Sequence, residues 1–187
     1  MQQLVYGVGI NDADYVVRKG GVFCPFYVRW SNMLKRCYNK ASLLAEPSYE
    51  NCYVGSEWLI FSNFKAWMEK QDHVGKHLDK DLLSKGSNCY SKHTCCFITT
   101  TLNNFLINDK GNGLPSGVCL DKSRGNYIAQ VCNPFTKKNE YLGRFTSPEE
   151  AHNRWKTRKH ELACQLANEQ LDSRIALALR GRYAQSK

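Results

Sequence analysis

The chain has 187 residues, a mass of 21.4 kDa and a formal net charge of +9, with 26 Lys and Arg against 17 Asp and Glu. This length allows one mid-sized domain or two small ones and excludes a large multi-domain enzyme. Hydrophobic residues make up 42%, which is ordinary for a globular protein and excludes a largely disordered chain. No apolar run approaches the roughly 20 residues of a membrane helix, and residues 1–12 lack the pattern of a signal peptide. We therefore expect a cytoplasmic protein with no membrane partner.

Nine cysteines without an export signal indicate a reducing environment. None of them forms the C-x2-C pair that a zinc ribbon uses. The nearest approach to a metal cluster consists of Cys89, His93, Cys95 and Cys96. Adjacent side chains on a strand point to opposite faces, so Cys95 and Cys96 cannot both face one ion there. We expect buried, reduced thiols and no structural zinc.

The charge is distributed unevenly along the chain. Residues 1–110 carry 13 basic and 10 acidic side chains, whereas residues 111–187 carry 13 basic and 7 acidic ones. Residues 108–113 are polar, include two glycines and are typical of a linker. We therefore expect an N-terminal domain over residues 1–107 and a C-terminal domain over residues 114–187, in an α+β fold.

Two helices are predicted in the first domain. Pro25 suits the first turn of a helix, and apolar residues follow it at spacings of three and four. This stripe consists of Phe26, Trp30, Met33, Leu34, Cys37 and Tyr38. A second helix is predicted over residues 61–71, and its buried side consists of Phe61, Phe64, Ala66, Trp67 and Met68. We interpret these aromatic residues as core.

The pattern after the second helix changes to short strands. Residues 77–83 and residues 94–99 each predict a strand, and residues 84–88 predict the turn between them. A short helix is predicted over residues 100–106. This segment therefore reads as strand, turn, strand and helix.

The second domain predicts a three-stranded antiparallel sheet followed by helices. The strands are expected over residues 117–120, 126–132 and 139–145, and alternation in the middle strand gives it one apolar face. Ser147 can cap a helix with Pro148 in its first position, and Glu150 can reach back to complete a capping box. The buried side of this helix consists of Ala151, Trp155, Leu162 and Leu166. A further helix is expected from Leu171, Ile175, Ala178 and Leu179.

A sheet with one helix behind it leaves its second face exposed. The turns and the last strand carry Lys122, Arg124, Lys137, Lys138 and Arg144. A slim sheet fits the DNA major groove, and its lysines and arginines would neutralise phosphates. The second domain therefore predicts double-stranded DNA as the partner.

The segment from residue 117 to residue 166 resembles the ethylene-response-factor (Apetala-type) DNA-binding domain. The resemblance rests on G-V, then G-x-Y-x-A-x-V, then Y-L-G-x-F, then S-x-E-E-A. That family lays its sheet in the major groove and reads bases from alternate strand positions. The resemblance implies that the base-reading residues here are Arg124, Gln130, Cys132, Asn139 and Tyr141. Its base preference does not carry over, because positions that hold arginine in the plant proteins hold Cys119, Asp121, Cys132 and Asn139 here.

The segment from about residue 26 to residue 105 resembles phage and bacterial HNH homing endonucleases, several of which carry an Apetala-type domain behind the nuclease. The resemblance rests on W-S-N-M-L-K-R-C-Y, S-E-W-L-I-F-S-N-F-K-A-W-M, L-D-K-D, Y-S-K-H-T-C-C-F-I-T and L-N-N-F. It implies a ββα unit around one divalent ion, and Mg2+ is the ion expected, because carboxylate and amide oxygens suit a hard cation. The metal ligands implied are Asp79 and Asn103. The resemblance places the protein in a bacterial host cell.

The chain departs from the HNH pattern at two positions. The position of the catalytic histidine holds Lys80, and the position of the supporting asparagine holds Thr94. A lysine is protonated near neutral pH and accepts a proton only if burial lowers its pKa by several units. His77 would share a strand face with Asp79, and His93 precedes the second strand, so either ring is an alternative base.

Two hypotheses follow for a DNA-binding protein of this kind. The first is a Mg2+-dependent DNA endonuclease or nickase, in which His77 or Lys80 serves the attacking water. The second is a non-catalytic DNA-binding regulator or competitor derived from such a nuclease. A third reading, RNA binding or protein interaction, has less support because Tyr141 is the one good stacking aromatic on the sheet. The sequence leaves the oligomeric state open.

Overall fold

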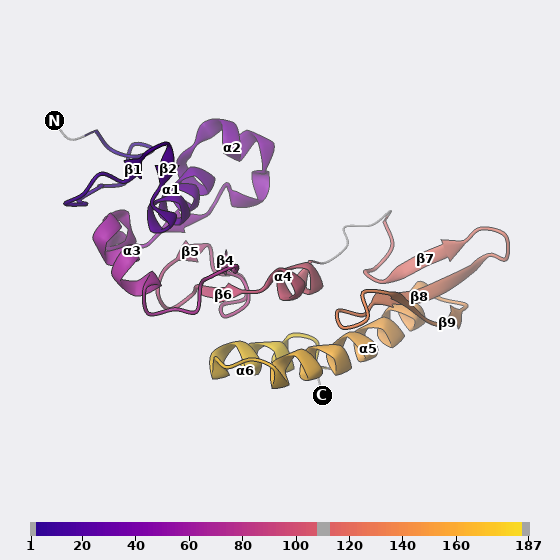
Figure 1. Cartoon of the computed structure of the whole chain (residues 1–187). Helices are drawn as coiled ribbons and strands as arrows, with labels where there is room; N and C mark the ends of the chain where they lie inside the picture. The colour runs from indigo at the N-terminus through magenta and orange to yellow at the C-terminus, as the bar shows by residue number, and fades with distance from the viewer. Residues whose placement is uncertain (1–2, 108–112, 185–187) are drawn as a thin grey trace. The chain divides into compact units, whose positions relative to one another are not determined.

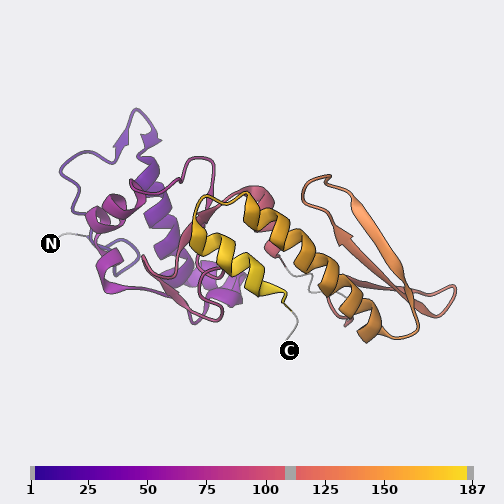
Figure 2. The ribbon, with the colours of Figure 1, turned by 90° about the horizontal axis from the view of Figure 1, so that it is seen from below.

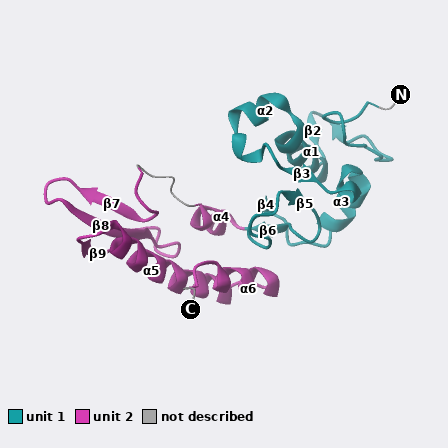
Figure 3. Ribbon diagram, turned by 180° about the vertical axis from the view of Figure 1, so that it is seen from behind, with its two compact units in different colours: residues 1–98 teal, residues 99–187 magenta. Residues whose placement is uncertain are grey.

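The computed structural model describes residues 3–107 and 113–184 and has an α+β fold, as predicted. The chain divides into two compact units, residues 1–98 and residues 99–187 (Figure 1, Figure 3). The sequence places the division later, at a linker over residues 108–113. Apart from Gly113, that linker lies outside the described residues. The difference comes from the helix α4 (Thr100–Leu106), which groups with the second unit.

The first unit is built on helices with short strands between them. Its helices are α1 (Pro25–Tyr38), α2 (Lys40–Ala45) and α3 (Phe61–Met68), with 3-10 turns at Pro47–Tyr49 and Ser56–Leu59. Its strands pair two by two: β1 (Arg18–Lys19) with β2 (Val22–Phe23), β3 (Tyr53–Val54) with β5 (Cys89–Tyr90), and β4 (His77–Asp79) with β6 (Cys96–Ile98). The β3–β5 pair is parallel and the other two are antiparallel.

The core of the first unit lies between α1 and α3. The indole of Trp30 is fully buried and its Nε1 donates a hydrogen bond to the carbonyl oxygen of Trp58 at 2.7 Å. Phe61 and Phe64 on α3 pack against these two indoles. The predicted stripe on α1 is buried at Trp30, Met33, Leu34 and Cys37 and half-buried at Phe26 and Tyr38. The aromatic residues are therefore core, as the sequence predicts.

Three predicted elements of the first unit are shorter in the structure. The second helix ends at Met68 instead of Gln71, and Ala66 is exposed instead of buried. The strand predicted over residues 77–83 ends at Asp79, because Oδ1 of Asp79 accepts hydrogen bonds from the backbone N–H groups that follow and turns the chain. The strand predicted over residues 94–99 covers Cys96–Ile98, and the helix that follows it agrees with the prediction.

The second unit contains the three-stranded antiparallel sheet in the order β7 (Val118–Asp121), β8 (Asn126–Cys132) and β9 (Asn139–Phe145). Its helix α5 (Pro148–Asn168) lies along one face of the sheet, and α6 (Ser173–Arg182) folds back beside α5 (Figure 2). The strands and both helices agree closely with the sequence. None of the described helices is long and apolar enough to cross a membrane.

The start of α5 differs from the prediction in one bond. The hydroxyl of Ser147 accepts from the backbone N–H of Glu150 at 3.1 Å, as a cap does. The carboxylate of Glu150 does not complete a capping box, because its Oε2 accepts from the hydroxyl of Thr146 at 3.3 Å. Leu171, predicted in the last helix, is 97% exposed and precedes α6, whereas Ile175 and Leu179 are buried as predicted.

Candidate nucleic-acid interface

The two faces of the sheet are chemically different. Ala129 and Val131 on β8 are buried on the side where α5 packs. Alternation along β8 therefore places Gln130 and Cys132 on the opposite face. Gln130 pairs with Tyr141 across the strands. We call this second side the open face; its residues are Cys119, Asp121, Asn126, Ile128, Gln130, Cys132, Asn139, Tyr141 and Arg144.

A charged pair fastens α5 to the sheet. Nε of Arg158 donates to Oε2 of Glu140 at 2.8 Å, and Nδ2 of Asn133 donates to Oε1 of Glu140 at 2.6 Å. These hydrogen bonds, from Arg158 first and from Asn133 second, lower the pKa of Glu140 to about 2. Arg158 also bonds Glu161, so this arginine is engaged on the helix side of the sheet.

A close backbone approach fixes the start of β7 against α5. Gly117 has a φ of 79°, and a Cβ atom at this position would lie 2.0 Å from Cδ1 of Trp155. Nδ1 of His152, one turn before Trp155, lies 2.9 Å from the carbonyl oxygen of Ser116. The edge strand is therefore placed by a contact that only glycine permits.

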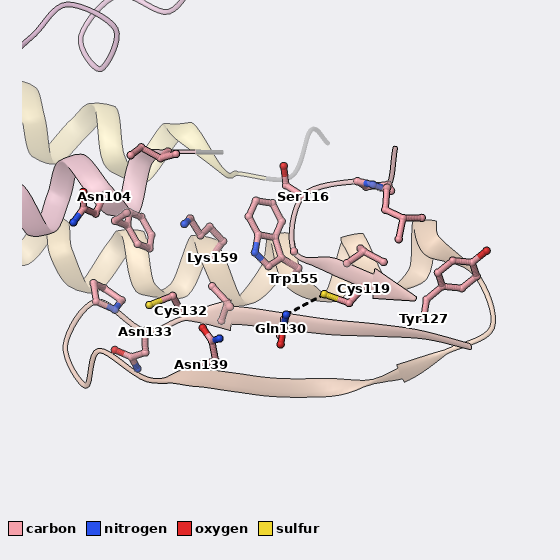
Figure 4. Close-up of a pocket in the computed structure, with 18 of the residues that line it drawn as sticks. Asn104, Ser116, Cys119, Tyr127, Gln130, Cys132, Asn133, Asn139, Trp155 and Lys159 are labelled. Carbon is pink, nitrogen blue, oxygen red and sulfur yellow. Dashed lines mark hydrogen bonds between the residues drawn. The ribbon is translucent and has the colours of Figure 1, made fainter. Parts of the chain in front are cut away.

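The open face is polar and its residues contact one another across the strands. Nε2 of Gln130 donates to Sγ of Cys119 at 3.0 Å (Figure 4). Nη2 of Arg144 donates to Oδ2 of Asp121 at 3.0 Å. Tyr141 is 63% exposed. This face presents amide, phenol and thiol groups to solvent.

Side chains of the two turns shape the loops that carry the cations. Before β8, the hydroxyl of Ser123 donates to Asp121 at 2.6 Å. This bond, with Arg144 and Arg124 nearby, lowers the pKa of Asp121. After β8, Oδ1 of Asn133 accepts from the backbone N–H groups of residues 135 and 136. Both loops are thereby held as Asx turns at the ends of the sheet.

These turns place four of the predicted DNA-binding residues at the surface. The exposed cations are Lys122 and Arg124 in the first turn and Lys137 and Lys138 in the second. Lys137 adopts a left-handed backbone with a φ of 58°. The cations therefore lie at the two ends of the sheet, whereas its middle is uncharged apart from the Asp121–Arg144 pair.

A cleft of about 1110 Å³ opens where β8 continues past the start of β7, beyond the Val118–Ala129 pair. Five predicted reading and phosphate-binding residues line it: Lys122, Gln130, Cys132, Lys137 and Asn139. Asn104 of α4 and Trp155 and Lys159 of α5 line the other side (Figure 4). These five predicted residues therefore share one surface, whereas Arg124, Lys138, Tyr141 and Arg144 do not line the cleft.

Lys159 is a feature that the sequence analysis missed. It is 6% exposed, and its Nζ lies 3.9 Å from the ring centre of Phe105 and 5.7 Å from those of Trp155 and Tyr183. An ammonium group among aromatic faces is held by cation–π attraction. A signal was present, because Lys159 follows Trp155 by four residues and so continues the buried stripe of α5.

The predicted nuclease residues have structural roles in the first unit. Oδ1 of Asp79 accepts from the backbone N–H groups of Asp81, at 3.0 Å, and Leu82, at 2.7 Å. Lys80 is 7% exposed, and its Nζ donates to Oδ1 of Asp81 at 2.6 Å. Desolvation is the largest single effect on Lys80 and lowers its pKa, but the hydrogen bond and charge of Asp81, together with Cys52, outweigh it, and the pKa is raised. Lys80 therefore lacks the lowered pKa that a general base needs.

The other predicted catalytic residues are scattered. Thr94 donates to the carbonyl oxygen of Cys89 at 2.6 Å and accepts from the N–H of Ser91, so it closes a turn. His77 and His93 are exposed. Asn103 is half-buried on α4, in the second unit, whereas Asp79 lies in the first.

The described residues contain no group of three or more His, Cys, Asp or Glu side chains that could hold a metal ion. Asp79 and Asn103, which the HNH resemblance implies as the Mg2+ ligands, belong to different units. Mg2+ is often held by one or two protein oxygens together with water and phosphate oxygens. These two residues are therefore the ones to test for a metal.

No protein-family model, no curated protein and no solved structure matches this chain. The two family resemblances therefore stay expectations drawn from short motifs. Function is inferred below from the side chains and their contacts.

Proposed function

We propose that this protein binds double-stranded DNA through the open face of the sheet β7–β8–β9. The observation that carries the proposal is the arrangement of charge on that sheet. Exposed cations stand at both ends, and the side chains between them are uncharged apart from the Asp121–Arg144 ion pair. Phosphates would meet the cations while base edges meet the middle of the sheet.

The shape of the sheet supports a duplex over a single strand. The major groove is about 12 Å wide and admits a slim β-ribbon. Single-strand RNA readers stack bases on several aromatic rings, whereas the open face carries one, Tyr141. Competition between duplex DNA and single-stranded RNA for the protein separates these two ligands.

The phosphate contacts are tested by replacing Lys137 and Lys138 together. The double variant K137Q/K138Q removes two exposed cations, and K137R/K138R keeps their charge as the matched control. If both lysines contact phosphates, the slope of log affinity against log salt falls in magnitude by about 1.8, at about 0.9 for each contact. Fluorescence anisotropy with a labelled duplex measures this slope. Equal slopes for the two variants would contradict a phosphate role for this turn.

Mg2+-dependent nicking of DNA is the second candidate function. It is favoured by the order of β4, β6 and α4 along the chain, which is the strand–strand–helix order that the HNH resemblance predicts. In this candidate Asp79 and Asn103 would hold the metal, a bound Mg2+ would supply charge stabilisation at the scissile phosphate, and His77 would accept the proton of the water. Lys80, paired with Asp81, favours the alternative of a regulator without catalysis.

The variant Asp79→Asn separates enzyme from regulator. An asparagine keeps the oxygen that accepts the two backbone hydrogen bonds at this turn, so the fold is preserved while the charge is removed. Asp81→Asn is the matched control. Nicking of supercoiled plasmid that needs Mg2+ and is lost in Asp79→Asn supports the nuclease. Equal activity of Asp79→Asn and the wild type would exclude Asp79 as a metal ligand. The absence of nicking by the wild-type protein supports the regulator.

The cellular setting follows from the same proposal. All nine cysteines are free thiols in the structure, as a reducing cytoplasm would keep them. A DNA-binding protein of phage type would meet its duplex in the cytoplasm of a bacterial host.

A further inference from the structure

The three strands of the sheet contain a single arginine, Arg144, and it is engaged. Its Nη2 donates to Oδ2 of Asp121 at 3.0 Å. Asp121 on β7 is paired with Asn126 of β8, and Arg144 on β9 is paired with Ile128 of β8. The ion pair therefore crosses the open face diagonally, over β8. A guanidinium fork bound to a carboxylate has fewer donors to offer to the O6 and N7 atoms of guanine.

Besides Tyr141, the open face carries the carboxamide side chains of Gln130 and Asn139. Gln130 lies on the central strand, and Asn139 lies on β9 opposite Cys132. A carboxamide has one donor group and one acceptor, which match N7 and the N6 amino group of adenine. Ile128, on the same face, supplies an apolar contact of the kind that suits the thymine methyl group.

The present bond of Gln130 leaves its amide available. Its Nε2 donates to Sγ of Cys119, and a thiol sulfur is a weak acceptor. A purine nitrogen is a better acceptor, so exchanging one for the other costs little. The side chain of Asn139 is exposed on the same face.

We propose that Gln130 and Asn139 read adenines, so that the preferred duplex carries A·T pairs at the centre of its site. This inference rests on the proposed DNA binding. The two residues are diagonal neighbours across β8 and β9, at roughly 7–8 Å between such positions in a sheet. Base pairs rise by about 3.4 Å, so the two adenines lie about two steps apart.

Selection from a random duplex library with the full-length protein tests this inference. The wild-type protein is expected to enrich two A·T pairs about two steps apart. A G·C pair at either position is expected to lower affinity roughly 5- to 150-fold, the range for one good bidentate contact. Gln130→Arg and Asn139→Arg are each expected to convert one of these positions to G·C. The control Asn153→Arg adds the same charge on the exposed side of α5 and is expected to leave the enriched site unchanged.

The outcomes separate the inference from the proposed function. An enriched G·C centre, or strong duplex binding without any enriched sequence, would overturn the reading of adenine and leave DNA binding in place. The absence of duplex binding would overturn the proposed function itself. Gln130→Glu is a second test if an arginine variant misfolds. A carboxylate accepts a hydrogen bond from the N4 amino group of cytosine, so this variant should enrich that base.

Discussion

Replacing Gly117 by alanine tests the contact that positions the edge strand of the proposed interface. The added Cβ would lie 2.0 Å from Cδ1 and 2.1 Å from Cγ of Trp155, where ordinary contact begins near 3.4 Å. The indole, or the backbone of β7, would therefore have to move by more than 1 Å. Overpacking of this kind costs about 1–3 kcal/mol.

The left-handed backbone adds a second cost at the same residue. Gly117 has a φ of 79°, and alanine in that conformation costs about 1 kcal/mol. The two effects predict that Gly117→Ala destabilises the second unit by about 2–4 kcal/mol. Gly125→Ala is the matched control, because Gly125 has a φ of 66° and no heavy atom within 4 Å of the added Cβ. The control should cost only about 1 kcal/mol.

Hydrogen exchange of the β8 peptides measures this difference within the intact chain. The amides around Ala129 and Val131 exchange through opening of the second unit, and each 1.4 kcal/mol of lost stability speeds exchange about tenfold. Gly117→Ala should therefore exchange at least several-fold faster than Gly125→Ala. Equal exchange in the two variants would refute the close contact between Gly117 and Trp155.

Three further predictions concern the second unit. Phe105→Ala should destabilise it by about 3–5 kcal/mol and speed hydrogen exchange in α4, because Phe105 is buried and faces the ammonium of Lys159; unchanged exchange would argue against this contact. Glu140→Gln should reduce the fall in the free energy of unfolding, measured with urea, as the pH is lowered. Ionised Glu140 stabilises the fold above its ordinary pKa of 4.5, and this contribution is lost as pH falls towards the folded value of about 2. The same dependence of the free energy of unfolding on acidic pH in the variant and the wild type would contradict this. Ser147→Ala should cost about 1 kcal/mol in the same unfolding assay through loss of the cap on α5, with Ser173→Ala as a control that removes no cap.

The second unit could be predicted well because its turns and alternation are explicit in the sequence. Asp121 and Asn133 are residues that bond their own following backbone, and they mark both turns of the sheet. Ala129 and Val131 alternate with polar residues, which gives the face that α5 covers. The base-reading residues were implied by the Apetala-type resemblance, and the register places Gln130, Cys132, Asn139 and Tyr141 on the open face.

The first unit was harder to predict because its strands are two or three residues long. The parallel pairing of Tyr53–Val54 with Cys89–Tyr90 joins segments far apart in the chain, and a two-residue strand has no period to detect. The sequence also placed the end of α3 too late. The last buried residue of this helix is Met68, where the helix ends, and Ala66 lies on its exposed side.

The environment of Lys159 and of Lys80 could not be read from residue type. Lys159 is buried only because aromatic rings from α4, α5 and the residue after α6 converge on it. Lys80 keeps its charge because Asp81, the next residue, turns back to pair with it. The burial of both lysines depends on tertiary contacts that charge patterning does not encode, whereas the pairing of Lys80 with Asp81 is between neighbours in the sequence.

Two exposed thiols on the open face allow the most direct test of DNA binding there. Cys119 and Cys132 are exposed, whereas Cys164 on α5 is half-buried and serves as an internal reference away from that face. Alkylation by iodoacetamide with and without saturating duplex DNA, followed by mass spectrometry, reports the solvent accessibility of each thiol. Binding through the open face predicts that duplex slows alkylation of Cys119 and Cys132 several-fold and leaves Cys164 unchanged. Unaltered alkylation of both open-face thiols in a protein that has bound duplex would contradict the account.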